Sequence, residues 1–233
     1  MSKNPIIISF DGNIGSGKST IVKYFEENFE IFCKGKNIDY KVCFLPEPVS
    51  IWESIKDEYD KNAIEKFYED NEKYGFSFQM MAYISRLSLF KEAFKNEYDI
   101  IFTERSMFTD KNVFAKMLYD NKKINTIEYQ IYNKWFDEFT GIIKDLKTVY
   151  IRTDPSICDQ RVKKRARSGE NISLDYLQDC HKYHDKWLNK SDNLKSKNIL
   201  IVDGNKDISR LENDQKNTYY NELIIKVFQF IQC

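Results

Sequence analysis

The N-terminal part of the chain contains the stretch Gly12-Asn13-Ile14-Gly15-Ser16-Gly17-Lys18-Ser19-Thr20. It follows a β-branched run at 5–10 and precedes an amphipathic stretch at 19–32, so the pattern G-x-x-x-x-G-K-[ST] occurs in a strand–loop–helix context. The glycines allow close approach of the backbone, and successive N–H groups with the helix N-terminus can surround phosphate oxygens. All nine residues are therefore expected to bind a nucleotide's phosphates, with Lys18 near the terminal phosphates and Ser19 as a Mg²⁺ ligand.

Hydrophobic periodicity predicts the rest of the fold. Short apolar runs predict four further strands, at 40–45, 99–103, 148–151 and 198–202. Longer stretches predict helices at 19–32, 61–72, 76–96, 109–119, 125–143, 155–165, 173–189 and 215–231. Strands that alternate with helices favour a parallel sheet covered on both faces. We therefore predict one α/β domain spanning 1–233, with a five-stranded parallel sheet.

Composition excludes several classes of protein. Basic and acidic residues number 36 each, so no global field favours nucleic acid or a membrane surface. The five cysteines are scattered and form no C-x-x-C pair, which is typical of free thiols in a reducing compartment. No apolar run approaches the roughly 18 residues of a membrane-spanning helix. With the first strand so near the N-terminus, we expect no signal peptide and a cytoplasmic protein.

Carboxylates at two predicted strand ends narrow the kind of phosphate-binding protein. Glu47 follows the second strand and Glu104 ends the third, and the carboxyl ends of parallel strands meet at one crevice. There Glu47 can take a proton from an attacking hydroxyl, and Glu104 lies where Mg²⁺ is expected. A GTPase would need an N-K-x-D guanine reader, whereas in Asn205-Lys206-Asp207 the aspartate comes one residue too early.

Together these motifs resemble the deoxynucleoside kinase family, in its deoxycytidine and deoxyguanosine kinase branch. The resemblance rests on G-N-I-G-S-G-K-S-T at 12–20, E-P-V-S-I-W at 47–52, F-S-F-Q at 76–79, S-R at 85–86, E-R-S at 104–106, and the stretch from R-V-K-K-R-A-R at 161–167 to L-D-Y-L-Q-D-C-H-K-Y-H-D-K-W-L at 174–188. It implies the three-layer P-loop kinase fold and transfer of the ATP γ-phosphate to a deoxynucleoside 5′-OH, with Mg²⁺ held by Ser19 and Glu104. It also implies a homodimer, to which 76–96 and 125–143 can contribute apolar faces.

The resemblance assigns the acceptor's reactive end and base. Glu47 resembles the general base, and Arg105 would orient it and the 5′-OH. Gln79 resembles the base reader, because its amide offers an acceptor and two donors. Arg86 and Asp110 match a charged pair of this branch. Because Asp110 only accepts hydrogen bonds, it favours an exocyclic amine and disfavours thymidine. The plainer interpretations are a solvated loop carboxylate for Glu47 and an ordinary surface ion pair for Arg86 and Asp110.

Other family positions concern the sugar and the pocket walls. The resemblance places Tyr68 and Glu170 at the 3′-OH, although the segment around Glu170 is one residue shorter than is usual in the family. Aromatic residues would line the base and sugar pocket, although isolated aromatics are more often plain core. These are Trp52, Phe67, Phe78 and Phe114.

The basic segment at about 161–171 resembles the family's lid. Arg161, Arg165 and Arg167 would fold over the ATP phosphates, and the first two share a helix face at i and i+4. The plainer interpretation is a solvated helix face. Asp203 and Asn205 lie in the loop that resembles the adenine contact. His181 and His184 match a structural signature, and no further ligands with zinc spacing accompany them.

Two other functions remain open at the level of sequence. A nucleoside monophosphate kinase of the thymidylate type would need further cationic groups for the acceptor's phosphate, and it commonly has Asp-Arg in place of Glu104-Arg105. A P-loop regulator that binds nucleotide without turnover would leave Glu47, Gln79 and Tyr68 without a role. The rank order of deoxycytidine, deoxyadenosine and deoxyguanosine is not determined by these motifs.

Overall fold

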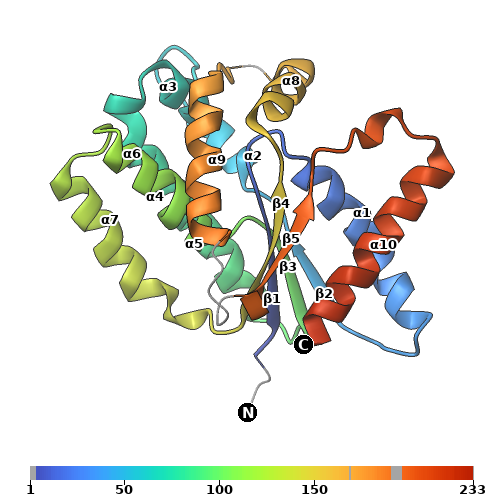
Figure 1. The fold of residues 1–233 in the computed structure, drawn as a ribbon. Helices are drawn as coiled ribbons and strands as arrows, with labels where there is room; N and C mark the ends of the chain where they lie inside the picture. The colour runs from blue at the N-terminus through green and yellow to red at the C-terminus, as the bar shows by residue number, and fades with distance from the viewer. Residues whose placement is uncertain (1–3, 168, 190–195, 233) are drawn as a thin grey trace.

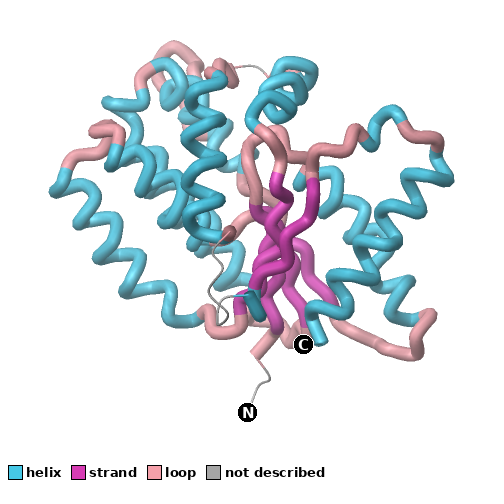
Figure 2. Tube along the Cα trace, viewed as in Figure 1, coloured by secondary structure: helices cyan, strands magenta, loops and turns pink. Residues whose placement is uncertain are grey.

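A parallel sheet forms the centre of the molecule. The computed structural model describes residues 4–167, 169–189 and 196–232. Five strands in these ranges pair in the order β2-β3-β1-β4-β5, and every pairing is parallel (Figures 1 and 2). They are β1 (Ile6–Asp11), β2 (Val42–Leu45), β3 (Ile100–Glu104), β4 (Leu146–Arg152) and β5 (Ile199–Asp203). Since β1 is central, the loop that follows it opens between the ends of β3 and β4.

Helices cover both faces of the sheet, which confirms the predicted three-layer α/β fold. On one face lie α1 (Lys18–Lys34) and α10 (Asn213–Gln232), and on the other α4 (Asn71–Ala93) and α7 (Thr126–Phe139) (Figure 1). The remaining α-helices among the described residues lie around the carboxyl ends of the strands or beside α4. They are α2 (Val49–Ser54), α3 (Ala63–Glu69), α5 (Met107–Thr109), α6 (Lys116–Asp120), α8 (Pro155–Arg165) and α9 (Leu174–Leu188).

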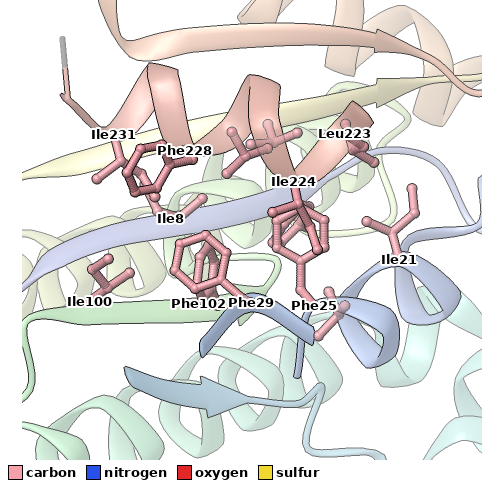
Figure 3. Packing of buried hydrophobic residues seen from close by; sticks show 14 of the residues in the cluster. Ile8, Ile21, Phe25, Phe29, Ile100, Phe102, Leu223, Ile224, Phe228 and Ile231 are labelled. Carbon is pink, nitrogen blue, oxygen red and sulfur yellow. The ribbon is translucent and has the colours of Figure 1, made fainter. Parts of the chain in front are cut away.

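The two cores follow from the alternation of side chains along the strands. Ile8 and Phe10 of β1 face α1 and α10, whereas Ile7 faces α4 and α7. Figure 3 shows the first core, in which the Phe102 ring lies 4.8 Å from the Phe29 ring, centroid to centroid, in an edge-to-face arrangement. Buried apolar residues on both faces of β1 explain why its sequence reads as a continuous apolar run.

The helices differ from the predicted ones in three places. The break predicted at 73–75 lies instead at Asp70, whose side chain caps α4 by accepting from the Lys73 N–H at 3.0 Å, while Gly75 is buried inside α4. Helix α2 was not predicted, because its six residues are too few for a periodic signal. The helix predicted at 109–119 is divided by a π-helical stretch, Asp110–Ala115.

The sequence predicts that no apolar run is long enough to form a membrane-spanning helix. Across the ranges that the structure describes, every helix is too short or too polar to cross a bilayer.

Candidate active site

The phosphate-binding loop is held in shape by close packing against its neighbours. Gly15 has φ 79°, and a Cβ at this position would lie 2.6 Å from the Cys158 carbonyl oxygen on α8. Gly17, with φ 98°, precedes the first turn of α1. Asn13 donates from its side-chain amide to the Leu177 carbonyl of α9 at 2.9 Å. The loop therefore needs glycine both for its backbone conformation and for its contact with α8.

Lys18 is buried under this loop. Its Nζ donates to the Asn13 carbonyl oxygen at 2.7 Å. Burial, together with the nearby positive charge of Arg105, lowers the pKa of Lys18 to about 8. An anion that entered the loop would supply the opposite charge that favours the protonated lysine.

Two oxygen-bearing side chains meet where the start of α1 approaches the end of β3. Ser19 Oγ donates to Glu104 Oε1 at 2.7 Å, which joins the loop to the carboxyl end of β3. A hydroxyl and a carboxylate suit a hard cation such as Mg²⁺, which takes its remaining ligands from water and substrate phosphates. The residues present therefore fit the metal that the sequence predicted.

Four charged side chains, of which Glu47 is partly buried and the other three are buried, form a network beside the loop. Arg105 Nη1 donates to Glu47 Oε1 at 2.6 Å, and Arg86 Nη2 lies 3.5 Å from the same oxygen. Arg86 also donates from Nε to Asp110 Oδ2 at 3.0 Å and from Nη1 to the Glu104 carbonyl at 2.7 Å. The side chains of Arg86 and Asp110 are 2% and 3% exposed. The pair is therefore not the ordinary surface ion pair that the sequence left open.

The network determines the charge of both carboxylates. Burial would raise the pKa of Glu47, but the guanidinium groups of Arg105 and Arg86 hold it at about 2. Glu47 is therefore ionised at neutral pH. Burial raises the pKa of Asp110, and Arg86 offsets part of this effect through its charge and its hydrogen bond. Arg86 thus favours the ionised form of Asp110.

One cavity of about 1280 Å³ connects these groups. It is lined by phosphate-loop residues, by the buried network, and by the predicted pocket and lid residues. The predicted residues that line it are Ile14, Gly15, Ser16, Gly17, Lys18, Ser19, Thr20, Glu47, Trp52, Phe67, Tyr68, Phe78, Gln79, Arg86, Glu104, Arg105, Asp110, Phe114, Arg161, Arg165, Arg167, Glu170 and Asn205.

Three predicted residues lie outside the cavity wall. The Gly12 carbonyl accepts from Arg105 Nη2 at 3.3 Å, and Asn13 faces α9 as described above. Asp203 is exposed at the end of β5 and accepts the Asn205 N–H at 2.9 Å. These residues shape the loops that carry their neighbours.

Aromatic side chains form a slot at one end of the cavity. The rings of Phe67 and Phe78 stack at 4.5 Å and 17°, and Trp52 meets Phe78 edge to face at 5.6 Å. Gln79 is 2% exposed, and its Oε1 has no hydrogen-bond partner among the described residues. An unpaired buried acceptor in a cavity wall is a ready contact for a polar ligand edge.

The basic segment approaches the loop from α8. Arg161 donates from Nη1 to the Ser16 carbonyl at 3.2 Å and from Nη2 to the Lys206 carbonyl at 3.1 Å. Arg165 and Arg167 both form ion pairs with Glu170, the second at 3.1 Å. Ser168, within the predicted lid, lies outside the described residues.

Sequence reasoning missed several lining residues. Tyr176 lies in the 174–188 motif, and its ring meets the Tyr68 ring edge to face at 6.3 Å. Ile64 and Ala82 line the aromatic end, and Tyr219 lines the other end of the cavity. Their residue types are ordinary for a core, so no local signal separates them from it.

His184 has the surroundings of a structural residue. Its ring is buried against Tyr150, and its Nδ1 is 2.7 Å from the Cys180 carbonyl oxygen. Burial lowers the pKa of His184 to about 3, so the imidazole stays neutral. His181 instead lies partly buried, with its Nε2 3.4 Å from Asp185 Oδ2.

A phosphate loop, an adjoining pair of metal-type oxygen ligands and a separate pocket with an ionised carboxylate are the parts of a phosphoryl-transfer enzyme. The model of the family described as deoxynucleoside kinase matches residues 8–227. The chain therefore belongs to the deoxynucleoside kinase family, and it is a kinase.

Individual relatives cover most of the chain. A probable deoxycytidine kinase of Fowlpox virus (strain NVSL) is 33% identical over 219 residues, which are 92% of this chain and 85% of the relative. Deoxycytidine kinase of Homo sapiens is 31% identical over 252 aligned positions, with 96% and 90% covered. The mitochondrial deoxyguanosine kinase of Xenopus laevis is 26% identical, with 86% and 82% covered.

The packing of Gly15 gives a prediction. The variant Gly15→Ala should bind a nucleoside triphosphate at least about tenfold more weakly, because a Cβ would meet Cys158 and the positive φ would be strained. Calorimetric titration measures the affinity. The matched control is Gly141→Ala, where a Cβ meets no atom of the described residues within 4 Å. Equal affinity in both variants would contradict the prediction.

Proposed function

We propose that this kinase transfers the γ-phosphoryl group of ATP to the 5′-OH of a deoxynucleoside, with Mg²⁺ as cofactor, as part of cytoplasmic nucleotide salvage. We further propose that deoxycytidine, deoxyadenosine or deoxyguanosine is preferred to thymidine. The observation that carries the proposal is the single cavity that joins the phosphate loop to the Glu47–Arg105 pair and the aromatic slot around Gln79. Membership of the family and the names of the relatives support the substrate class.

Glu47 and Arg105 have the geometry for the acceptor hydroxyl. Glu47 is ionised and can take the 5′-OH proton, while Arg105, 2.6 Å away, holds the carboxylate in place. A pKa of about 2 makes Glu47 a weak base. A weak base suits a loose transition state, in which positioning and electrostatics contribute most of the catalysis.

The donor side supplies positive charge. Lys18 and Arg161 lie at the phosphate loop, and Arg165 lines the same cavity from α8, so they can stabilise charge that builds on the transferring group. Ser19 and Glu104 would hold Mg²⁺, and the bound ion would offset the negative charge of the phosphate oxygens.

Base preference follows from the hydrogen-bonding types in the slot. Gln79 offers both a donor and an acceptor, so by itself it discriminates weakly between bases. Asp110 accepts and Arg86 donates, and both are buried. An exocyclic amine would satisfy Asp110, whereas the thymine carbonyl oxygen would leave a buried carboxylate facing another acceptor.

The sugar end couples the acceptor to the lid. Tyr68 and Glu170 both line the cavity, and burial with the charge of Glu170 raises the pKa of Tyr68, so the phenol stays protonated and can donate. A 3′-OH bound at Glu170 would contact the same carboxylate that pairs with Arg165 and Arg167. Acceptor binding would then help to hold the lid arginines in place.

The first test measures products. With Mg·ATP, the wild type should form deoxynucleoside monophosphates from deoxycytidine, deoxyadenosine or deoxyguanosine, and Glu47→Gln should lose about 100-fold or more in kcat while it still binds nucleoside. Chromatography of the products gives the rates of the wild type and of Glu47→Gln.

The control variant is Glu53→Gln, which changes an exposed carboxylate of α2 and should retain full activity. Phosphorylation of thymidylate but of no nucleoside would show a monophosphate kinase instead. Binding of ATP without any product would show a non-catalytic regulator. Full activity in Glu47→Gln would remove this residue from the role of base.

The second test concerns the base. The double variant Arg86→Met with Asp110→Ala removes both buried charges together, so neither is left unpaired. We expect the kcat/KM ratio of thymidine to deoxycytidine to rise on the order of tenfold. The matched control is Lys111→Met with Asp137→Ala, which removes a more exposed pair 2.8 Å apart. An unchanged ratio in the first double variant would show that the buried pair does not set preference.

A homodimer is the assembly that the surface supports. Helices α4 and α7 lie on the same side of the sheet (Figure 1), and both carry exposed apolar side chains. These are Ile84, Ile127, Ile131, Trp135 and Phe139, of which Ile127 is 72% exposed. A second copy of the chain would cover this surface, because exposed apolar patches favour contacts between proteins.

The dimer has a direct test. Ile127→Glu with Trp135→Glu should convert the dimer to a monomer in light scattering, because each charge would be buried unpaired in the interface. The control is Ile31→Glu on α1, which is 69% exposed on the other side of the sheet and should leave the mass unchanged. A wild-type monomer would contradict the proposal.

A further inference from the structure

Asp11, the last residue of β1, carries a buried carboxylate that the proposed mechanism does not use. The side chain is 0% exposed and does not line the cavity. It accepts hydrogen bonds from Ser9 Oγ at 2.6 Å and from Thr109 Oγ1. Burial raises the pKa of Asp11, and the two hydroxyl donors partly offset this effect. Burying a carboxylate away from water costs free energy unless hydrogen bonds offset the loss of hydration, so these two donors stabilise Asp11.

The Thr109 hydroxyl has a defined direction. Its oxygen accepts the Ser106 N–H at 3.1 Å, and its proton is donated to Asp11. The turn from Ser106 to Thr109 is thereby closed on itself and attached to the end of β1. Thr109 is separated from Asp11 by almost 100 residues of sequence, so this bond joins two distant segments.

The neighbours of Asp11 hold the same segment at a second place. The Phe10 carbonyl accepts the Arg105 N–H at 3.0 Å, and the Gly12 carbonyl accepts from Arg105 Nη2 at 3.3 Å. Arg105 has φ 62°, a left-handed conformation that is strained for a residue with a side chain. Such a conformation persists where the surroundings impose it. Residues 10–12 therefore form hydrogen bonds with both Arg105 and Thr109.

The attached turn lies between two residues of the acceptor site. Arg105 precedes it, and Asp110 follows Thr109 directly. Gly12, which follows Asp11, begins the phosphate loop. We propose that Asp11 is a positioning residue that acts through Thr109 to hold Arg105 and Asp110 in register with the phosphate loop. This role rests on the proposed function, because it concerns the alignment of the acceptor with the phosphate donor.

Three variants separate this role from general stabilisation. Thr109→Val keeps the shape of the side chain and removes its hydroxyl, whereas Thr109→Ser keeps the hydroxyl. Ser9→Ala is the matched control, because it removes the other hydroxyl donor to the same carboxylate and leaves the turn untouched. Melting temperatures of all three measure how far each substitution destabilises the fold.

The first readout does not depend on activity. Hydrogen–deuterium exchange of the peptide covering 104–110 should become about tenfold faster in Thr109→Val, and it should stay at the wild-type rate in Ser9→Ala and Thr109→Ser. Unchanged exchange in Thr109→Val, or equal acceleration in Ser9→Ala, would overturn the proposal. Because Thr109→Val also removes the acceptor of the Ser106 N–H, Asp11→Asn, which keeps that bond, is measured beside it. Exchange in Asp11→Asn equal to that in Ser9→Ala would again overturn the proposal, and this comparison holds even if Thr109→Val does not fold.

The second readout is kinetic. In Thr109→Val, kcat should fall about tenfold or more while KM for ATP stays within about threefold, because the acceptor groups shift and the phosphate loop does not. The thymidine to deoxycytidine ratio should rise with it, and Thr109→Ser should restore both values. Equal losses of kcat in Thr109→Val and Ser9→Ala would reduce Asp11 to a structural residue. A wild type without turnover would refute the proposed function, and the exchange experiment would still decide the positioning role.

Discussion

The parallel pairing of β1 with β3 is the constraint on which the site depends. Its register sets Phe10 opposite Glu104, so the loop that leaves β1 begins beside the residues that leave β3. The hydrogen bond between Ser19 and Glu104 and the bonds from Arg105 to residues 10 and 12 then form across a short gap. A shift of one residue in β3 would turn its side chains, including Glu104, to the opposite face of the sheet.

Charge balance is the second constraint, because the site places four ionic side chains in a poorly hydrated region. Each carboxylate of the network has a guanidinium partner, and Arg86 serves both Glu47 and Asp110. Removing one member would leave a buried charge without its partner, which is far more destabilising than removing a matched pair. The proposed preference among bases uses the same property, since a ligand that fails to satisfy Asp110 meets a similar penalty.

Most of the fold was predictable from sequence, because its signals are local. The five strands were confirmed, and apolar runs next to a glycine-rich motif are sufficient to predict them. The predicted break between helices was misplaced, since it lies at Asp70. Gly75 resembles a helix end, but it lies inside α4 and allows close packing, because a Cβ there would be 3.3 Å from the Lys123 carbonyl oxygen. The π-helical stretch that begins at Asp110 likewise has no periodic signal in the sequence.

By itself the sequence determined that the chain is an α/β protein with a phosphate loop, and its motifs led to the family that the comparisons then showed. Only the tertiary structure decided which charges of the network are paired, that Arg105 is left-handed, and that Asp11 bonds to Thr109. The physical reason is range. Periodicity and turn chemistry act between near neighbours in the chain, whereas burial and hydrogen bonding at the site join segments that are dozens of residues apart.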